Sequence, residues 1–201
     1  MCYLINPNEI FIPRRNFVFI TALNQNLSLR LFRTSDASEL LSLVESNRKH
    51  LSPWLPWVES MQTSSDALTH IKLLLKKHSE NGAFDAAILY QQRMVGSIGL
   101  SPISWTHRST MMGYWLAAEA QNKGIMTSCA QRVAQWVFHD LHLHRLEIRC
   151  SPANLKSQKI PKKLGFTWEG TLRQCEWVEG KPNDLLVFGM LAPEWFHRFP
   201  S

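Results

Sequence analysis

Cysteine is scarce and scattered in this sequence of 201 residues. The four thiols, at Cys2, Cys129, Cys150 and Cys175, show neither the paired spacing of a metal site nor a secretory signal beside them. We therefore expect reduced thiols in a cytoplasmic protein. The eight histidines also lack cysteine or carboxylate partners at the spacing of metal ligands, so the sequence predicts no metal centre.

Long apolar runs and internal repeats are absent as well. No stretch reaches the roughly 18 apolar residues that a membrane-spanning helix needs, which argues against an integral membrane protein. Hydrophobic residues make up 45% of the chain and charged residues 19%, as in ordinary globular proteins. A chain of this length suits one domain with a sizeable core.

Acidic residues are fewer than basic ones, 16 against 22, and the net charge is +6. This excess favours an anionic partner, which could be a nucleotide-like cofactor, an acidic protein or a nucleic acid. The sequence has no helix-turn-helix, zinc or RNA-binding signature, so direct binding to nucleic acid is not expected.

Apolar periodicity predicts an α+β fold in which helices flank a central mixed sheet. Helices are expected between the polar cap at residues 34–36 and Asn47, after a cap at Ser64 or Ser65, over residues 125–137 and over residues 154–164. Strands are expected at residues 27–33, 84–90, 94–100, 110–116, 145–150, 167–178 and 184–190. Residues 27–201 are interpreted as one domain, and residues 1–26 as an extension of unknown role.

A polar loop around Gly124 joins a predicted strand to a predicted helix that begins at Ile125. The first backbone N–H groups of a helix have no partner within it, so they provide a site for an anion. Gly124 lets the backbone approach such an anion, and Lys123 adds a positive charge. An ordinary strand-to-helix connection remains the alternative, because short glycine loops are weak evidence.

Residues 121–126 resemble the pyrophosphate-binding loop of the GNAT acyltransferases, and in particular their ribosomal-protein N-acetyltransferase branch. Met126 departs from the broader signature, which has Gly or Ala there. Three later segments resemble the same branch in the same order, at residues 154–157, 163–166 and 169–174. The resemblance spans roughly residues 27–195. It implies the GNAT fold, a mostly antiparallel sheet in which the strands holding residues 114–116 and 148–149 splay apart.

The same resemblance implies that acetyl-coenzyme A (acetyl-CoA) is the cosubstrate. Backbone groups on the splayed strand would bind its pantetheine arm, and the loop that follows would bind its pyrophosphate. The residues assigned to the cofactor in this way are Trp115, Leu116, Gln121, Asn122, Lys123, Gly124, Ile125, Met126, Thr127 and Asn154.

Acetyl transfer from a thioester to an amine needs a neutral amine, a polarised carbonyl and a proton for the departing thiolate. Ser157 is the candidate acid, since the resemblance places its turn beside the coenzyme A sulfur; a water, or a purely local backbone role for Ser157, is the alternative. Many GNAT enzymes use a tyrosine in this helix, but no tyrosine follows Tyr114 here. Glu176 is the candidate base, with Glu59 and Glu147 as weaker ones, and an ordinary surface carboxylate is its alternative.

Three tryptophans are candidates for the acceptor pocket. Trp54 and Trp57 lie in a loop that Pro53 and Pro56 make stiff and non-helical, and core packing is the alternative role for both. Trp177 follows the candidate base directly. The resemblance assigns this region to the acceptor side of the site.

The leading hypothesis is an acetyl-CoA-dependent N-acetyltransferase in which the amine attacks directly. Its acceptor would be a protein N-terminal amine, and an acidic ribosomal protein would suit a basic enzyme. A small-molecule amine, such as an aminoglycoside or a polyamine, is the alternative acceptor. A non-catalytic coenzyme A-binding module is the other alternative, with Met126, Ser157 and Phe188 as signs of drift. The sequence leaves room for a homodimer without indicating one.

Overall fold

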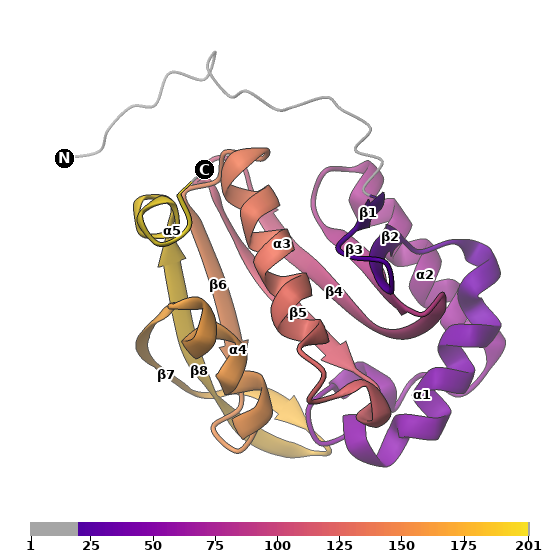
Figure 1. The fold of residues 1–201 in the computed structure, drawn as a ribbon. Coiled ribbons are helices and arrows are strands. Elements are labelled where there is room, and N and C mark those ends of the chain that lie inside the picture. The colour runs from indigo at the N-terminus through magenta and orange to yellow at the C-terminus, as the bar shows by residue number, and fades with distance from the viewer. Residues whose placement is uncertain (1–19, 201) are drawn as a thin grey trace.

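The computed structural model describes residues 20–200, in which a single sheet of eight strands carries helices on both faces (Figure 1). The strands are β1 (Ile20–Ala22), β2 (Leu27–Leu31), β3 (Phe84–Tyr90), β4 (Arg93–Ser104), β5 (Ser109–Leu116), β6 (Arg145–Cys150), β7 (Thr167–Val178) and β8 (Lys181–Leu191). Their order in the sheet is β1-β2-β3-β4-β5-β6-β8-β7. Neighbours pair antiparallel except β5 and β6, which are parallel, so the expected mixed, mostly antiparallel sheet is confirmed.

The helices divide between the two faces of the sheet. Helices α1 (Ala37–Leu51) and α2 (Ser64–Ser79) pack over β3 and β4, whereas α3 (Ile125–His139) and α4 (Leu155–Leu164) pack over β5 and β6 (Figure 1). A short helix, α5 (Ala192–Arg198), follows β8. The described part of the chain, residues 20–200, also holds three 3₁₀ turns: η2 (Thr34–Asp36), η3 (Pro56–Val58) and η4 (Ala118–Ala120). No helix within residues 20–200 is both long and apolar enough to cross a membrane.

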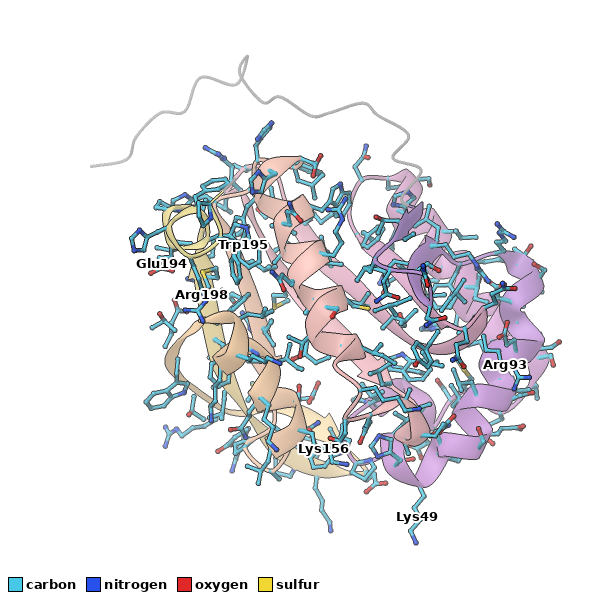
Figure 2. All side chains as sticks on the ribbon, in the orientation of Figure 1. Lys49, Arg93, Lys156, Glu194, Trp195 and Arg198 are labelled. Atoms are coloured by element: carbon cyan, nitrogen blue, oxygen red, sulfur yellow. The ribbon has the colours of Figure 1, made fainter. Side chains whose placement is uncertain are left out.

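Side-chain alternation along the strands separates two cores. The larger core fills the α3 side of the sheet with residues such as Val133, Phe138 and Ile148, and Trp195 of α5, labelled in Figure 2, closes it. The smaller core lies under α1 and α2 and includes Leu40. Each core therefore holds a different set of helices against the same strands.

Local capping signals set the helix boundaries. Thr63 caps helix α2. Its hydroxyl accepts from the backbone N–H of Asp66, while the Asp66 carboxylate accepts from the backbone N–H of Thr63, a reciprocal capping box. The cap is thus Thr63, and neither Ser64 nor Ser65, the two caps expected from the sequence. Asn154 caps helix α4, and Gly165, in the left-handed conformation, terminates it, as predicted.

Helix α1 and strand β1 differ from the sequence prediction: α1 is longer than expected, and β1 was not expected. Helix α1 continues past Asn47 to Leu51, because no proline interrupts it before Pro53 and three basic residues in its last turn favour the helix C-terminus. Strand β1 falls within the segment set apart as residues 1–26, and its Ile20 pairs with Arg30 of β2. Residues 1–19 of that segment lie outside the described residues.

The parallel pair at the centre of the sheet comes apart. Strands β5 and β6 pair from Ser109 with Arg145 to Met112 with Ile148, and no pairing continues beyond this point. Residues 113–116 of β5 keep partners on β4 only, and the end of β6 keeps partners on β8 only. The expected splay is therefore present, and each strand has a backbone edge facing the gap.

Candidate active site

The open end of β5 leads through η4 directly to the N-terminus of α3 (Figure 1). Gly124 caps this helix at φ 75°, a left-handed conformation that side chains disfavour. Among residues 20–200 no side chain caps α3, and no acidic residue lies in its first turn, so its first N–H groups remain available. A side-chain carbon placed on Gly124 would have no neighbour within 4 Å. This open space before a helix N-terminus fits an anionic phosphate group.

Side chains from two distant helices hold the loop before α3. Lys156 of α4, labelled in Figure 2, donates from Nζ to Oε1 of Gln121 at 2.7 Å. The Gln121 Nε2 lies 2.7 Å from the His50 ring nitrogen of α1. Nearby, the buried Asn47 accepts from the backbone N–H of Ala118 at 2.8 Å. The loop is therefore positioned from both sides of the sheet before any ligand binds.

The residues assigned to the cofactor occupy adjoining places in the structure. Trp115 and Leu116 lie on the β5 edge that β6 leaves unpaired. Residues 121–124 form the loop, in which Lys123 is exposed, and residues 125–127 form the first turn of α3. Ile125 and Met126 bury their side chains, so only their backbone N–H groups can face a ligand there. Asn154 uses its side-chain oxygen to cap α4.

Ser157 contacts a hydroxyl group that the sequence did not point to. Its backbone N–H donates to the Asn154 oxygen at 3.1 Å, and its Oγ donates to the Tyr114 hydroxyl oxygen at 3.4 Å. The Tyr114 hydroxyl in turn donates to the Ser157 carbonyl at 3.1 Å. That carbonyl lacks a partner in α4 because Pro161, four residues later, has no N–H. Tyr114 thus supplies the donor that Pro161 removes.

Burial raises the pKa of the Tyr114 hydroxyl well above the ordinary value, so this hydroxyl stays protonated. The hydroxyl remains a hydrogen-bond donor throughout the neutral range. Sequence reasoning looked for a tyrosine within α4 and missed one arriving from β5. The alternation of Met112, Tyr114 and Leu116 on one strand face carried the signal, since that face packs against α3 and α4.

Glu176 lies on the edge strand β7, opposite Asn183 of β8. The Asn183 Nδ2 donates to the Glu176 carboxylate at 3.4 Å, and Ser151, which directly follows β6, donates to the other end of the same amide at 3.0 Å. Glu176 is therefore linked through one amide to the end of the splayed strand. Trp177 is 66% exposed.

Glu59 and Glu147, the two weaker candidates for the base, differ from Glu176 in their surroundings. Glu59 is exposed. Glu147 accepts hydrogen bonds from Arg145 and Arg149 at 2.9 and 2.7 Å. Burial acts to raise the pKa of Glu147, but these arginines outweigh it and hold the pKa below the ordinary value. A carboxylate committed to two arginines is a poor base at neutral pH.

A cavity of about 280 Å³ opens on the opposite face of the sheet, beneath α1 and α2. Trp57 lies in its wall, with its ring 5.3 Å from the His70 ring and 5.9 Å from the Trp115 ring. Trp54 is not among the lining residues. The cavity is lined by Phe32, Leu40, Leu55, Trp57, His70, Leu74, Lys77, Asp85, Ser97, Gly99, Ser101, Gly113, Tyr114 and Trp115.

Asp85 is a carboxylate in the floor of this cavity that sequence reasoning missed. Burial raises its pKa to about 7, against the opposing charge of Lys77. Burial, together with Lys77, lowers the pKa of His70 in the wall. A signal did exist in the sequence, because Asp85 is the one charged residue in the otherwise apolar strand β3.

Two of the three described cysteines are buried. Burial raises the pKa of Cys129 to about 12 and also raises the pKa of Cys150, so both thiols stay protonated at neutral pH. Cys175 is exposed and free. Within residues 20–200, no group of three or more His, Cys, Asp or Glu side chains is placed to hold a metal ion.

A mixed sheet whose central parallel strands splay toward a glycine-capped helix defines the class of acyl-coenzyme A-dependent acyltransferases. Residues 26–167, more than half of the chain, match the acetyltransferase (GNAT) domain family. The chain belongs to this family and is an N-acetyltransferase. The fold, the enzyme class and the resemblance expected from the sequence are thereby confirmed.

Known proteins similar to this chain include ribosomal-protein acetyltransferases. The Bacillus subtilis protein YdaF, provisionally named as a ribosomal N-acetyltransferase, is 29% identical over 182 residues, covering 89% of this chain and 98% of its own length. The Escherichia coli ribosomal-protein-serine acetyltransferase is 23% identical over 168 residues, covering 84% and 94%. The solved structure of the microcin C7 self-immunity acetyltransferase MccE with acetyl-CoA and AMP is 25% identical, with a TM-score of 0.80, covering 84% and 94%.

Proposed function

We propose that this enzyme transfers the acetyl group of acetyl-CoA to the N-terminal amine of a protein by direct attack of the amine. The observation that supports this most strongly is the continuity of the unpaired β5 edge with the uncapped N-terminus of α3. An extended backbone edge suits the amide groups of a pantetheine arm, and a helix N-terminus suits its pyrophosphate.

The residues around the gap match these two parts of the ligand. The β5 backbone at Trp115 and Leu116 would bind the pantetheine amides. The open space at Gly124 and the N–H groups of residues 125–127 would bind the pyrophosphate, with Lys123 adding positive charge. Gln121, Asn122 and Asn154 would shape the loop and the start of α4. Acetyl-CoA supplies a thioester whose carbonyl carbon is open to attack by an amine.

Ser157 is proposed as the acid that gives a proton to the departing sulfur. The Tyr114 hydroxyl holds the Ser157 Oγ and carbonyl, so the serine has a defined orientation. Glu176 is proposed as the base that takes a proton from the amine, with Asn183 fixing its carboxylate. Trp54, Trp57 and Trp177 are proposed as acceptor contacts; of the three, Trp57 lines the cavity under α2.

The acceptor is inferred from relatives and from charge. The Escherichia coli relative is named for acetylating a ribosomal protein serine. A net charge of +6 suits an acidic protein segment, because opposite charges speed association. We propose a cytoplasmic site of action on the same grounds, with residues 27–201 as the catalytic domain. A homodimer remains a proposal that light scattering would test directly.

The deciding experiment measures thiol release from acetyl-CoA across three classes of acceptor. The panel contains N-terminal peptides of acidic ribosomal proteins, aminoglycosides and polyamines. We expect turnover with a peptide and none with the same peptide carrying a blocked N-terminus, which separates the terminal amine from lysine side chains. Turnover confined to a small amine would overturn the protein acceptor. Coenzyme A binding without turnover on any amine would favour the non-catalytic alternative.

A further inference from the structure

Three residues form a row across the sheet on the face that α1 and α2 cover. Asp85 of β3 pairs with Gly99 of β4, and Gly99 pairs with Gly113 of β5. A methyl group on Gly99 would overlap the Asp85 carboxylate, whereas one on Gly113 would meet nothing within 4 Å. The Asp85 carboxylate therefore lies over Gly99, and the hollow beside it is the open space at Gly113, one strand spacing of about 4.8 Å further on.

This hollow meets the coenzyme side of the sheet at Gly113. Met112 is the last β5 residue that pairs with β6, so Gly113 is the first residue beside the gap between the splayed strands. The next β5 residue, Tyr114, lines the cavity and also holds Ser157 on the other side. A group in the hollow therefore lies next to the place where the proposed acetyl donor would end.

The Asp85 carboxylate has no hydrogen bond or ion pair with another side chain anywhere in the described part of the chain. The charged or titratable side chains that share the cavity are Lys77 and His70 of α2, while α1 contributes only Leu40. Tyr114 of β5 also lines it, but its hydroxyl is bonded to Ser157 on the other face of the sheet. Lys77 is exposed and lies at electrostatic rather than hydrogen-bonding range. The carboxylate thus keeps its acceptor capacity free.

Aromatic rings line the same cavity as this carboxylate. Trp57 and Trp115 line the cavity together, with ring centres 5.9 Å apart. A positive group is attracted to the face of such rings as well as to a carboxylate. The combination suits an ammonium ion better than a neutral or anionic ligand.

We propose that Asp85 binds the ammonium group of the acceptor and selects amines carried at the end of a slim segment. The proposal rests on the proposed function in one respect, because it takes the acceptor to be an amine. Ligand pockets span roughly 300–1,000 Å³. At about 280 Å³, this cavity has room for an amine-bearing end and not for a folded partner.

The titration of Asp85 adds support. With its pKa raised to about 7, Asp85 gains its charge across the neutral range, and an ammonium ion beside it would lower that pKa again. The acceptor would therefore bind better as the pH rises through 7. His70 is held neutral by burial and Lys77 is at the exposed rim, so neither replaces the incoming cation.

The main test compares Asp85→Asn with the wild-type enzyme in steady-state kinetics. We expect the KM for the acceptor to rise by about tenfold or more, the loss of one charge-assisted hydrogen bond, while kcat changes less. The rise of kcat/KM with pH near 7 should also disappear. Coenzyme A affinity should stay unchanged. Asp140→Asn, which alters an exposed carboxylate after α3, is the matched control.

A second variant tests the hollow without touching the carboxylate. Gly113→Ala adds a methyl group where no atom lies within 4 Å, so the protein should fold and bind coenzyme A normally. The methyl group should nevertheless raise the acceptor KM by occupying the space beside Asp85. An unchanged KM in both variants would overturn the proposal, whatever their stability.

Calorimetry gives a measurement that does not depend on turnover. Each acceptor is titrated into the protein in the presence of coenzyme A, with an N-acetylated peptide as the uncharged comparison. We expect Asp85→Asn to lose the preference for the free amine. Titrations with the peptide and with spermidine then show whether the preferred amine is a protein N-terminus or a polyamine. Equal affinities in the variant and the wild-type enzyme would overturn Asp85 as the binding group. Failure of the proposed function would appear separately, as amine binding without thiol release.

Discussion

Gly124 is the residue at which the cofactor assignment is easiest to test. Its backbone is left-handed, its surroundings are open, and the uncapped N–H groups of α3 follow it. Replacing it by aspartate would place a carboxylate against the pyrophosphate, so we expect Gly124→Asp to weaken coenzyme A binding by about tenfold or more. Calorimetric titration with coenzyme A measures this directly.

Gly180 provides a matched control for the backbone effect. It is also left-handed, at φ 71°, with no atom within 4 Å of an added side chain, but it lies in the turn between β7 and β8. Gly180→Asp should cost similar stability and leave coenzyme A affinity intact. Equal affinity in both folded variants would remove the pyrophosphate from the α3 loop.

Glu176 carries a separate prediction, about the rate of the reaction and not about binding. Glu176→Gln keeps the shape of the side chain and its contact with Asn183 but cannot accept a proton. We expect kcat at neutral pH to fall by roughly 10²-fold, the usual contribution of a positioned base. Acceptor KM and coenzyme A affinity should change little, which distinguishes this variant from Asp85→Asn. A wild-type pH–rate profile would remove Glu176 as the base.

Sequence reasoning reached some of these residues and not others, for a physical reason. Gly124 and Asn154 act through their own chain neighbours, as a helix cap must, so local pattern was sufficient. Tyr114 and Asp85 acquire their surroundings from residues far away in the chain. The donor role of Tyr114 depends on Pro161, 47 positions later by number, and the exposure of Asp85 in a hollow depends on two glycines of other strands.

At the scale of elements, helix α1 supports a loop that belongs to the other face of the sheet. Its Asn47 is buried, donates to the Leu43 carbonyl at 3.0 Å and accepts from the Ala118 N–H at 2.8 Å. Ala118 begins η4, which leads to the α3 loop. The amide of one side chain thus connects a helix above the acceptor cavity with the segment proposed to hold the coenzyme.

Removing that amide should affect both stability and the loop. Asn47→Ala leaves the Ala118 N–H without a partner, so we expect the free energy of unfolding to fall by about 1–3 kcal/mol. Coenzyme A affinity should fall as well, because the loop loses one of its supports. Urea denaturation and calorimetry measure the two effects. Ser42→Ala, on the exposed side of the same helix, is the control, and equal behaviour of the two variants would contradict this link.

The bounds of strands β6 and β4 show which strand ends the sequence pattern can predict and which it cannot. Strand β6 matches the predicted residues 145–150, because its alternation between buried and exposed positions is complete. Strand β4 runs to Ser104, past the predicted end at residue 100, since its last residues pair again with β5 after an irregularity in the register. Such pairing is a tertiary effect, and no local signal encodes it.

At the scale of the whole molecule, the carboxylates Asp36 and Asp85 have pKa values shifted in opposite directions, so they affect the stability of the protein in different pH ranges. Burial acts to raise the pKa of Asp36, but the hydrogen bonds from Arg30 and from the Arg33 backbone, with the charges of both arginines, together hold it below the ordinary 3.8. This carboxylate stabilises the fold above pH 3.8, and its contribution is lost as the pH falls further. Asp85 behaves oppositely, since its pKa rises from 3.8 to about 7 on folding.

Asp85 should therefore make the protein less stable as the pH rises from about 4 to about 7. Over that range the folded state binds a proton at Asp85 that the unfolded state has released, so the free energy of unfolding falls. His70 opposes this below pH 6.5, because its folded pKa is lowered and the unfolded state binds the extra proton. Because Asp85→Asn and the wild-type enzyme both retain His70, the difference between their stabilities isolates the contribution of Asp85.

We expect Asp85→Asn to gain stability relative to the wild-type enzyme between pH 4 and pH 8. A full shift of this size corresponds to a gain on the order of a few kcal/mol, since one pKa unit is worth about 1.4 kcal/mol. Urea denaturation at successive pH values measures the difference, with Asp140→Asn as the exposed control. Parallel curves for Asp85→Asn and the wild-type enzyme would mean that Asp85 is already ionised at acid pH. The cavity would then present its charge constantly, and acceptor binding would lose its dependence on pH near 7.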